Sequence, residues 1–296
     1  MSLKLCWWNI GISPPIKKEK KGKAEAIELA KKYIKEISQS RSIDFFGLCE
    51  ISEDESITFS DLASELDLVY LDLSDKVGRI IIDMSIMYES SKIEYVSHKT
   101  ITKYQPDGRG LRVGVRVVFK DVKTDRYITF FLSHWPSMLS AGNEIRDDIA
   151  TILRQEIDSI LNRHGVDSQI ICMGDYNSPP YSSAIHEKLF ATRDYHNIKK
   201  RKALLFNPFW SLLANGSSNN IGTYYYKSAK SNRWFVLDQM MFSSSFLYGS
   251  ETCFRLDKSS FDFHNIISDD NIIEDMVFFN NFDHYPIFCE LSHVSE

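Results

Sequence analysis

The sequence lacks a long uninterrupted hydrophobic run. No window approaches the roughly 18 consecutive apolar residues that a membrane-spanning helix needs, and the N-terminal stretch MSLKLCWWNI holds too short an apolar run for a signal peptide. The chain also lacks a Pro/Ser-rich linker and any repeat of fixed period within its 296 residues. We therefore predict a soluble cytoplasmic protein with no membrane span, built as a single domain over residues 1–296.

Cysteine is scarce, and its spacing matches neither a disulfide framework nor a metal-binding pair. The five cysteines are scattered, at least four lie in apolar runs, and none forms a C-x-x-C motif; they are Cys6, Cys49, Cys172, Cys253 and Cys289. We expect buried, reduced thiols in a reducing compartment.

Positive charge is not in excess. Lys and Arg number 35 against 40 Asp and Glu, a net charge of −5, so the global field does not attract polyanions. This counts against a dedicated nucleic-acid binder, although a local basic rim could still gather phosphates. Acidic residues that hold a metal ion would also inflate the negative count. The hydrophobic fraction of 43% is ordinary for a globular protein and excludes wholesale disorder.

Apolar runs rich in β-branched or aromatic residues recur along the chain and are bounded by turn residues. They predict strands over residues 43–49, 80–88, 111–119, 127–133, 168–173, 222–226, 235–242 and 286–291. Two segments, 27–37 and 145–161, carry apolar residues at the helical period instead. Because strands outnumber helices and neighbours could pair as hairpins, the pattern favours an α+β fold with mixed or antiparallel sheets.

Several apolar strands end in a polar residue, where ligands gather in folds of this kind. Asn9, Glu50 and His134 each follow such a run directly. Glu50 offers the carboxylate oxygen that a hard cation such as Mg²⁺ prefers. Asn9 could donate to a phosphate or hold a metal-bound carboxylate in place, and His134 could bind a phosphate or protonate a leaving oxygen. Taken singly, each is also typical of an ordinary turn or strand-end residue.

The sharpest single motif is Gly-Asp-Tyr-Asn at positions 174–177, which follows the apolar run 168–173. We expect Gly174 to let the backbone turn, and the prolines that follow to end the strand. Asp175 and Asn177, two residues apart, are expected to project to the same side.

Asp238 lies inside the apolar run 235–242, so this charge needs a partner. A histidine is the natural one, because a buried carboxylate fixes the tautomer of an imidazole and raises its basicity. The dipeptide Asp283-His284, just before the last predicted strand, supplies that histidine and a further carboxylate.

This order of residues, spread from position 9 to position 284, resembles the endonuclease/exonuclease/phosphatase superfamily. That superfamily includes deoxyribonuclease-I-like nucleases, abasic-site endonucleases, inositol-polyphosphate 5-phosphatases and neutral sphingomyelinases. The resemblance implies a four-layer α/β/β/α sandwich with the site at one end. It also implies a phosphoester hydrolase that uses Mg²⁺, with Mn²⁺ as a substitute.

The resemblance also assigns roles. Asn9 and Glu50 would lie at the metal ion with Asp283 nearby, and Asp175 and Asn177 at the scissile phosphate. Asp238 would orient His284, and His134 would match the other active-site histidine of the family. Either His284 or Asp175 could activate the attacking water. The sequence departs from the family pattern at Gly11 and Phe282, which weakens any transfer of substrate identity.

Cations in loop-like sequence bear on the substrate. A cluster formed by Lys199, Lys200, Arg201 and Lys202 precedes the aromatic residues Phe206, Phe209 and Trp210. Such a mixture suits a strand of nucleic acid, although these rings could equally be the core side of a short helix. Arg109 could reach a phosphate or could be an exposed turn residue.

These features favour a nuclease with DNA as its substrate, and the sequence does not reveal the oligomeric state. The alternative enzyme is a phosphatase or phosphodiesterase that acts on a small-molecule or lipid phosphate. A third possibility, a degenerate binding module, would require lost catalytic residues, and the sequence retains every central one.

Overall fold

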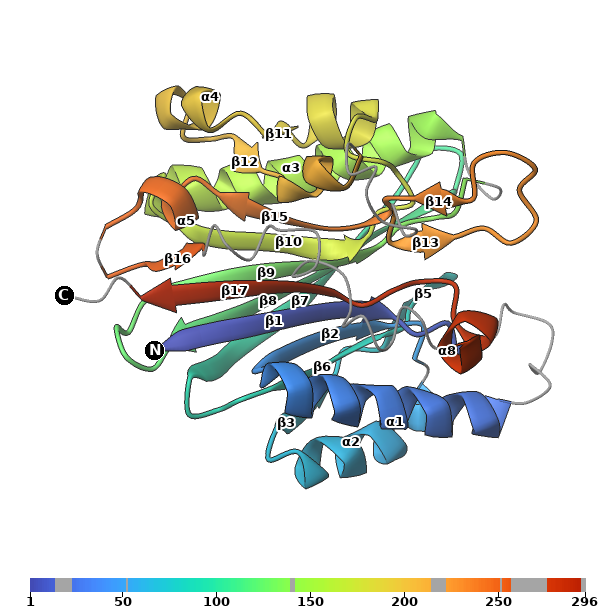
Figure 1. Cartoon of the computed structure of the whole chain (residues 1–296). Coiled ribbons are helices and arrows are strands. Elements are labelled where there is room, and N and C mark those ends of the chain that lie inside the picture. The colour runs from blue at the N-terminus through green and yellow to red at the C-terminus, as the bar shows by residue number, and fades with distance from the viewer. Residues whose placement is uncertain are drawn as a thin grey trace.

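Two β-sheets pack face to face between two layers of helices (Figure 1). The computed structural model describes residues 1–13, 23–51, 53–138, 142–213, 222–250, 252–256 and 276–293. Parallel and antiparallel pairs both occur, for example β1 with β2 and β1 with β17. The predicted α+β class and the four-layer sandwich of mixed sheets are therefore confirmed.

The first sheet has the strand order β16-β17-β1-β2-β6-β3. Its strands are β1 (Ser2–Asn9), β2 (Phe45–Cys49), β3 (Val69–Asp72), β6 (Met84–Tyr88), β16 (Phe254–Leu256) and β17 (Ile287–His293). Helices α1 (Lys23–Arg41) and α2 (Ser56–Glu65) cover its outer face, at the bottom of Figure 1. The buried side of α1 carries the apolar stripe that the sequence predicts over 27–37.

The second sheet has the order β11-β12-β15-β10-β9-β8-β7. Its strands are β7 (Ile93–Tyr104), β8 (Gly110–Asp121), β9 (Tyr127–His134), β10 (Gln169–Asp175), β11 (Ala191–Thr192), β12 (Leu205–Phe206) and β15 (Asp238–Ser243). Helix α3 (Asn143–His164) covers its outer face and contains the predicted segment 145–161. Gly165 caps this helix with a φ of +87°.

Shorter elements lie around the rims of the two sheets. They are β4 (Asp75–Val77), β5 (Ile80–Ile82), β13 (Tyr224–Tyr225), β14 (Trp234–Phe235), α4 (Tyr195–Lys200), α5 (Ser245–Tyr248), α8 (Met276–Asn281), 3₁₀ turns at Glu53–Glu55 and Pro208–Leu213, and a π-helical turn at Ser183–Lys188. β4 pairs with β5, and β13 pairs with β14, as two-stranded ribbons.

Aromatic side chains fill the space between the sheets. Phe45 of β2 stacks on Phe130 of β9 with 4.5 Å between ring centroids, and the ring of Phe119 meets both edge-on. All three are fully buried. Each such side chain contributes about 1.5–3 kcal/mol by leaving water, so this layer fixes the two sheets against each other and places their ends in register.

Two predicted strands prove to be broken, one at a charged residue and the other just before one. The run 80–88 divides at Asp83 into β5 and β6, which belong to different sheets. The run 235–242 divides at Val236 and Leu237, and Asp238 is the first residue of β15, so its predicted mid-strand position is wrong. The side chain of Thr223 accepts the Leu237 and Asp238 amide hydrogens at 3.0 and 2.9 Å, replacing strand pairing at the break.

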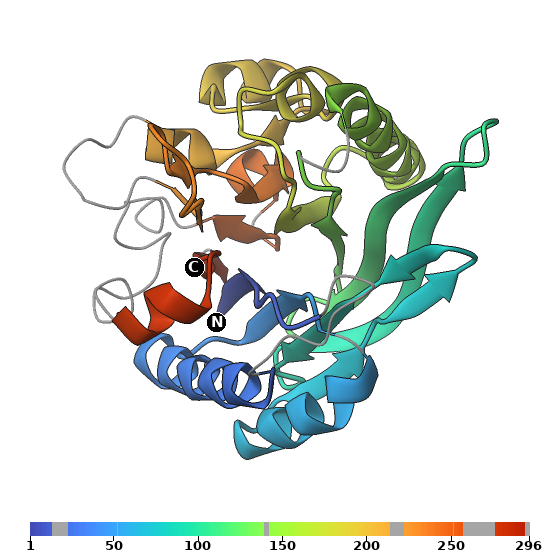
Figure 2. The ribbon, with the colours of Figure 1, turned by 90° about the vertical axis from the view of Figure 1, so that its right-hand side faces the viewer.

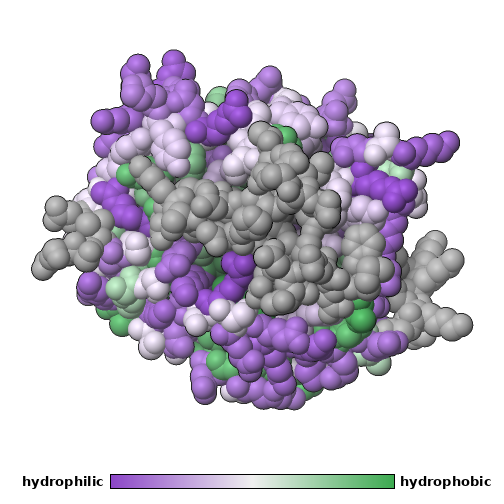
Figure 3. All heavy atoms as spheres, in the orientation of Figure 1, coloured by the Kyte–Doolittle hydropathy of each residue, from purple (hydrophilic) through white to green (hydrophobic). Residues whose placement is uncertain are grey.

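All five cysteines are buried and free, which confirms the expectation of buried thiols. None of the helices in the described ranges is both long and apolar enough to cross a membrane. Figure 3 shows mainly hydrophilic side chains where α1 and α4 meet solvent, with scattered hydrophobic ones between them.

Candidate active site

Several strand ends meet at one end of the sandwich, on the right in Figure 1 and facing the viewer in Figure 2. The strands β1, β2, β9 and β10 finish there, whereas β15 and β17 begin there. Pairing places Asn9 beside Cys49, and Asp175 between His134 and Asp238. Residues remote in sequence therefore reach one mouth because their strands are neighbours.

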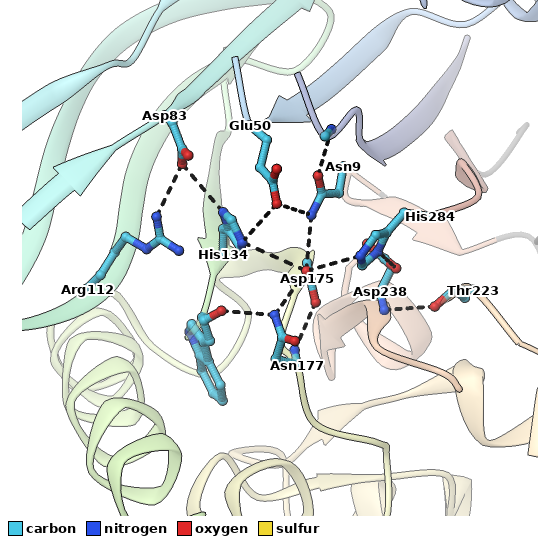
Figure 4. Close-up of polar contacts among 12 residues, drawn as sticks. Asn9, Glu50, Asp83, Arg112, His134, Asp175, Asn177, Thr223, Asp238 and His284 are labelled. Carbon is cyan, nitrogen blue, oxygen red and sulfur yellow. Dashed lines mark hydrogen bonds and ion pairs between the residues drawn. The ribbon is translucent and has the colours of Figure 1, made fainter. Parts of the chain in front are cut away.

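Asp175 is the centre of this cluster (Figure 4). Its Oδ2 atom accepts hydrogen bonds from Nδ2 of Asn9 at 3.2 Å and from Nδ2 of Asn177 at 3.1 Å. The Nε2 atoms of His284 and His134 lie 3.7 and 3.9 Å from the same oxygen. Only 2% of the Asp175 side chain is exposed, so these donors take the place of water around the carboxylate.

Glu50 lies beside Asp175 and is the more accessible of the two carboxylates. Its Oε1 atom is 3.2 Å from Nδ2 of Asn9 and 3.6 Å from Nε2 of His134, and 27% of its side chain is exposed. Its backbone is left-handed, with φ at +58°, and its carbonyl accepts the amides of Ile12 and Ser13. The strained backbone turns the carboxylate back over the mouth instead of along β2.

Asn9 holds these carboxylates in place with its amide nitrogen. Its Oδ1 atom accepts the backbone N–H of Gly11 at 3.1 Å, which leaves Nδ2 directed at Glu50 and Asp175. Gly11 sits at φ +66°, a conformation that glycine adopts without strain. Of the two functions that the sequence leaves open for Asn9, the contacts match the one in which it positions carboxylates.

The Gly-Asp-Tyr-Asn segment is built differently from the expected turn. Gly174 continues β10, and a side chain there would meet the carbonyl of Ser133 at 2.1 Å, so glycine is needed for close approach of β9 and not for a turn. Asn177 follows at φ +47°. Its Nδ2 atom donates to Asp175 and, at 3.0 Å, to the carbonyl of Trp135, so its amide group holds Asp175 within the protein.

His284 and Asp238 form a buried pair, as predicted. The Nδ1 atom of His284 lies 2.8 Å from Oδ2 of Asp238, whose Oδ1 accepts the indole N–H of Trp7 at 3.2 Å. The backbone carbonyl of His284 accepts the indole N–H of Trp8, and the ring of Tyr224 packs 4.6 Å from the imidazole. Since Asp238 accepts the Nδ1 proton, Nε2 of the neutral ring is the free basic atom and faces Asp175.

The surroundings of His284 favour its charged form. Burial lowers its pKa, but the negative charges of Asp238 and Asp175 outweigh that effect and raise the pKa to about 10. Positive charge bound beside Asp175 would offset these carboxylates and bring the pKa back down.

His134 has its own carboxylate, which the sequence analysis missed. Its Nδ1 atom lies 3.5 Å from Oδ1 of Asp83, and the same oxygen is 3.4 Å from the guanidinium of Arg112. Both imidazoles at the site thus face a carboxylate with Nδ1 and point Nε2 at Asp175. The signal was present, because Asp83 interrupts the apolar run 80–88 just as Asp238 interrupts its own run.

Asp83 is therefore predicted to be a positioning residue for His134. Changing Asp83→Asn keeps the shape but removes the charge, and we expect turnover to fall on the order of 10-fold, as for other groups that orient an active-site histidine. KM and the melting temperature should stay near their wild-type values, and Asp61→Asn, at an exposed position of α2, serves as control. Equal turnover in the two variants would contradict the role.

The donor set fits a hard divalent cation. Glu50 and Asp175 present carboxylate oxygens at the mouth, and no described lysine or arginine forms an ion pair with either. Ligand atoms of Asp175, Asp238 and His284 also lie within 4.8 Å of one another. In that trio, however, Nδ1 of His284 is already bonded to Asp238, so Glu50 and Asp175 are the better pair of ligands.

The structure does not bring Asp283 into this set. Asp283 is exposed, and its backbone carbonyl accepts a hydrogen bond from the amide of Tyr225. Its charge raises the pKa of His284 less than the charges of Asp238 and Asp175 do. Within the described ranges no hydrogen bond or ion pair joins its carboxylate to Glu50, so its predicted place at the metal is not supported.

The predicted cation cluster Lys199, Lys200, Arg201 and Lys202 lies at the wrong end of the sandwich. The Lys202 carbonyl accepts the Ser244 hydroxyl, just beyond the last residue of β15, whereas Asp238 at the site is the first. Ser243 lies five residue steps along the strand from Asp238, a distance of about 17 Å. Figure 1 accordingly places α4 at upper left, away from the mouth.

The aromatic residues that follow that cluster are not available to a substrate. Phe206 and Phe209 are buried in the core, as the alternative interpretation expected, although Phe206 belongs to strand β12 and only Phe209 to a short helical turn. Trp210 packs against His186 and beneath the guanidinium of Arg193. Arg109, by contrast, does lie at the site end, at the tip of the β7-β8 hairpin, where its nearest charged partner is Asp107 at 3.9 Å.

Fold and site together match the phosphoester hydrolases, a class that generally uses a divalent metal ion. The chain belongs to the Endonuclease/Exonuclease/phosphatase family, whose model matches residues 17–274. No curated protein shows a significant sequence match.

Solved structures of similar fold cover nearly the whole chain. The human Nocturnin catalytic domain with bound sulfate is 15% identical with a TM-score of 0.61, over 98% of this chain and 94% of that one. The mannosyl-6-phosphatase Bt3783 of Bacteroides thetaiotaomicron is 15% identical (TM-score 0.61; 98% and 99% covered). The D. rerio TDP2 complexed with a single-strand DNA product is 13% identical (TM-score 0.59; 98% and 99% covered). At these identities the likeness concerns the fold.

Proposed function

We propose that this protein is a Mg²⁺-dependent nuclease that hydrolyses phosphodiester bonds in DNA. The observation that carries the proposal is the convergence on Asp175 of Glu50 and of two imidazoles, each backed by its own carboxylate. One set of groups can therefore hold a cation and activate a water molecule. It can also bind the phosphate or protonate the leaving oxygen.

His284 is the better candidate for the base. Both oxygens of Asp175 already accept hydrogen bonds, from Asn177 and Asn9, so this carboxylate is engaged in contacts within the protein. His284 keeps Nε2 free while Asp238 holds Nδ1, so it can take the proton of the attacking water that Asp175 aligns.

His134 lies across the mouth and completes the set. Asp83 faces its Nδ1 atom and fixes the ring, and in the imidazolium form the Nε2–H group can donate to a phosphate oxygen. A divalent cation held by Glu50 and Asp175 would supply positive charge to the phosphate and to the departing oxygen. Mn²⁺, with similar oxygen preferences, is expected to substitute for Mg²⁺.

A polymer substrate is favoured by the wall beside His284. A cavity of about 280 Å³ lies there, lined by Gly11, Tyr224, Tyr226, Lys227 and Asp283 among others. The rings of Tyr224 and Tyr226 are near parallel, with 6.5 Å between centroids. Aromatic faces next to a cation suit a base or sugar that adjoins the scissile phosphate. The likeness to D. rerio TDP2 with its single-strand DNA product points the same way.

A phosphatase or phosphodiesterase for a small-molecule phosphate is the second candidate. The net charge of −5 and the exposed Asp283 at this cavity disfavour a long polyanion. The likeness to mannosyl-6-phosphatase Bt3783 adds a small sugar phosphate to the substrates worth testing.

Incubation with supercoiled plasmid separates these functions. We expect nicking with Mg²⁺ and none with EDTA, and the rate should fall steeply with salt because phosphate contacts along DNA are screened. Turnover of a generic phosphodiester with an inert plasmid would instead select the small-substrate enzyme. Inertness on both, with either metal ion, would contradict hydrolysis altogether.

A further inference from the structure

A second cavity, of about 380 Å³, lies far from the active site. It opens between the last turns of α3 and the outer face of β8 and β9, toward the left-hand end of Figure 1. Tyr127 begins β9 at this cavity and His134 ends β9 at the active site, a separation of about 23 Å along the strand. A ligand here could not touch the catalytic groups.

The cavity exists because α3 does not cover this corner of the sheet. Arg116 and Val118 of β8 and Thr129 of β9 point away from the core between the sheets, toward the helix layer. Ile160 closes the helix side, and the exposed ring of Tyr127 stands at the rim. Apolar and planar surfaces therefore line the floor and one wall.

Positive charge dominates the rim. Arg116, Arg126 and Arg163 all line the cavity, and His164 lies beside the last of them. Among the described residues, the guanidinium of Arg126 donates to neutral acceptors: the Thr252 hydroxyl at 3.2 Å, the Ser250 hydroxyl at 3.4 Å and the Asp167 carbonyl at 3.4 Å. These bonds aim its guanidinium without cancelling its charge.

The carboxylates nearby do not neutralise these arginines. Glu156 is 3.5 Å from Arg116 but is shared with Lys99 at 3.2 Å. Asp167 lines the cavity, yet only its carbonyl contacts Arg126. In the part of the chain that the structure describes, no carboxylate forms an ion pair with Arg126 or Arg163. Guanidinium groups whose charge is not neutralised, beside an apolar floor, are complementary to a ligand that has both an anionic group and an apolar or planar part.

We propose that this cavity is a binding site for a phosphorylated small molecule. Its phosphate lies among Arg126, Arg163 and Arg116, which offer the fork of N–H donors that phosphate oxygens accept. Its apolar or planar part lies against Val118, Ile160 and the ring of Tyr127. The volume falls in the range of about 300–1,000 Å³ typical of small-ligand pockets. The site is separate from the active site, so the proposal does not depend on the proposed nuclease activity.

Titration calorimetry with AMP in EDTA tests the site, since EDTA removes the metal ion that product binding at the active site would need. Inorganic phosphate and adenosine, the two parts of AMP, are measured separately to test the phosphate and the apolar halves of the site. We expect AMP to bind at one site and more tightly than phosphate, with adenosine weakest. The double variant Arg126→Ala, Arg163→Ala should weaken AMP binding on the order of 10- to 100-fold, as expected for the loss of two charged hydrogen-bond donors.

Lys199→Ala, Lys200→Ala is the matched control, because it removes the same charge from an exposed cluster elsewhere. Should the double arginine variant unfold, the exposed Arg163→Ala alone must still weaken AMP binding. Millimolar AMP and phosphate that fail to bind, adenosine that binds as tightly as AMP, or equal losses in both double variants would each overturn the proposal. So would AMP binding that disappears in Glu50→Gln but persists in the arginine variants.

Discussion

Replacing His284 with alanine is expected to lower turnover on a generic phosphodiester by about 10²- to 10⁴-fold, the contribution of one general acid–base group. The expectation rests on Nε2, which faces Asp175 at 3.7 Å while Asp238 holds Nδ1 at 2.8 Å. Alanine removes the imidazole that Asp238 positions at the mouth. Steady-state rates at saturating Mg²⁺ and substrate give the measurement.

The control for that experiment is His196→Ala. His196 is an exposed histidine of α4, at the far end of the sandwich, and its loss should leave turnover unchanged. His284→Ala also leaves the buried carboxylate of Asp238 without its imidazole, so the melting temperature must be followed in parallel. A folded variant with wild-type turnover would exclude His284 as the base.

The site could be predicted from the sequence where a charge broke a hydrophobic pattern. Asp175 and Glu50 follow runs that are otherwise apolar, and Asp238 interrupts one. A buried charge needs a partner, because its burial without one costs free energy. The resemblance then paired Asp238 with His284, and the two are 2.8 Å apart. The fold class followed from the same runs, because their length and composition distinguish strands from the two periodic helices.

The features that the sequence did not predict depend on which strands pair with each other in the sheets. Nothing near Lys199 or Lys202 in the sequence shows that β12 pairs with the distal end of β15, and that pairing takes the cluster away from the mouth. Asp83 carried the same signal as Asp238, but the resemblance assigns it no partner, so its contact with His134 was missed. Strand β7 was missed because most of its residues are exposed, so no face alternates; its pairing with β8 alone makes it a strand.

The function of Asn9 illustrates a finer limit. The sequence identifies an amide that could donate to a phosphate or hold a metal-bound carboxylate, and the resemblance places it at the metal ion. The choice is made by Gly11, whose amide engages Oδ1 and leaves Nδ2 for Glu50 and Asp175. The local turn therefore occupies the amide oxygen of Asn9 and directs its amide nitrogen at the two carboxylates. This N–H group lets the two negative charges stay close to each other before a cation binds.

Removal of divalent metal with EDTA is expected to abolish hydrolysis, and Mg²⁺ or Mn²⁺ in excess should restore it. Glu50→Gln keeps the side-chain shape and an oxygen for Asn9 but removes one negative charge from the mouth. We expect the Mg²⁺ concentration for half-maximal activity to rise by at least about 10-fold. The exposed Glu94→Gln is the control, measured by Mg²⁺ titration of initial rates.

The two variants separate the duties of the site. His284→Ala should lower turnover at every Mg²⁺ concentration while leaving half-saturation near its wild-type value, because Asp238 and not a cation engages its ring. Glu50→Gln should shift half-saturation and recover much of its rate when Mg²⁺ is abundant. An unchanged Mg²⁺ response in Glu50→Gln would mean that another group holds the ion, and Asp175 would then have to do so with donors on both of its oxygens.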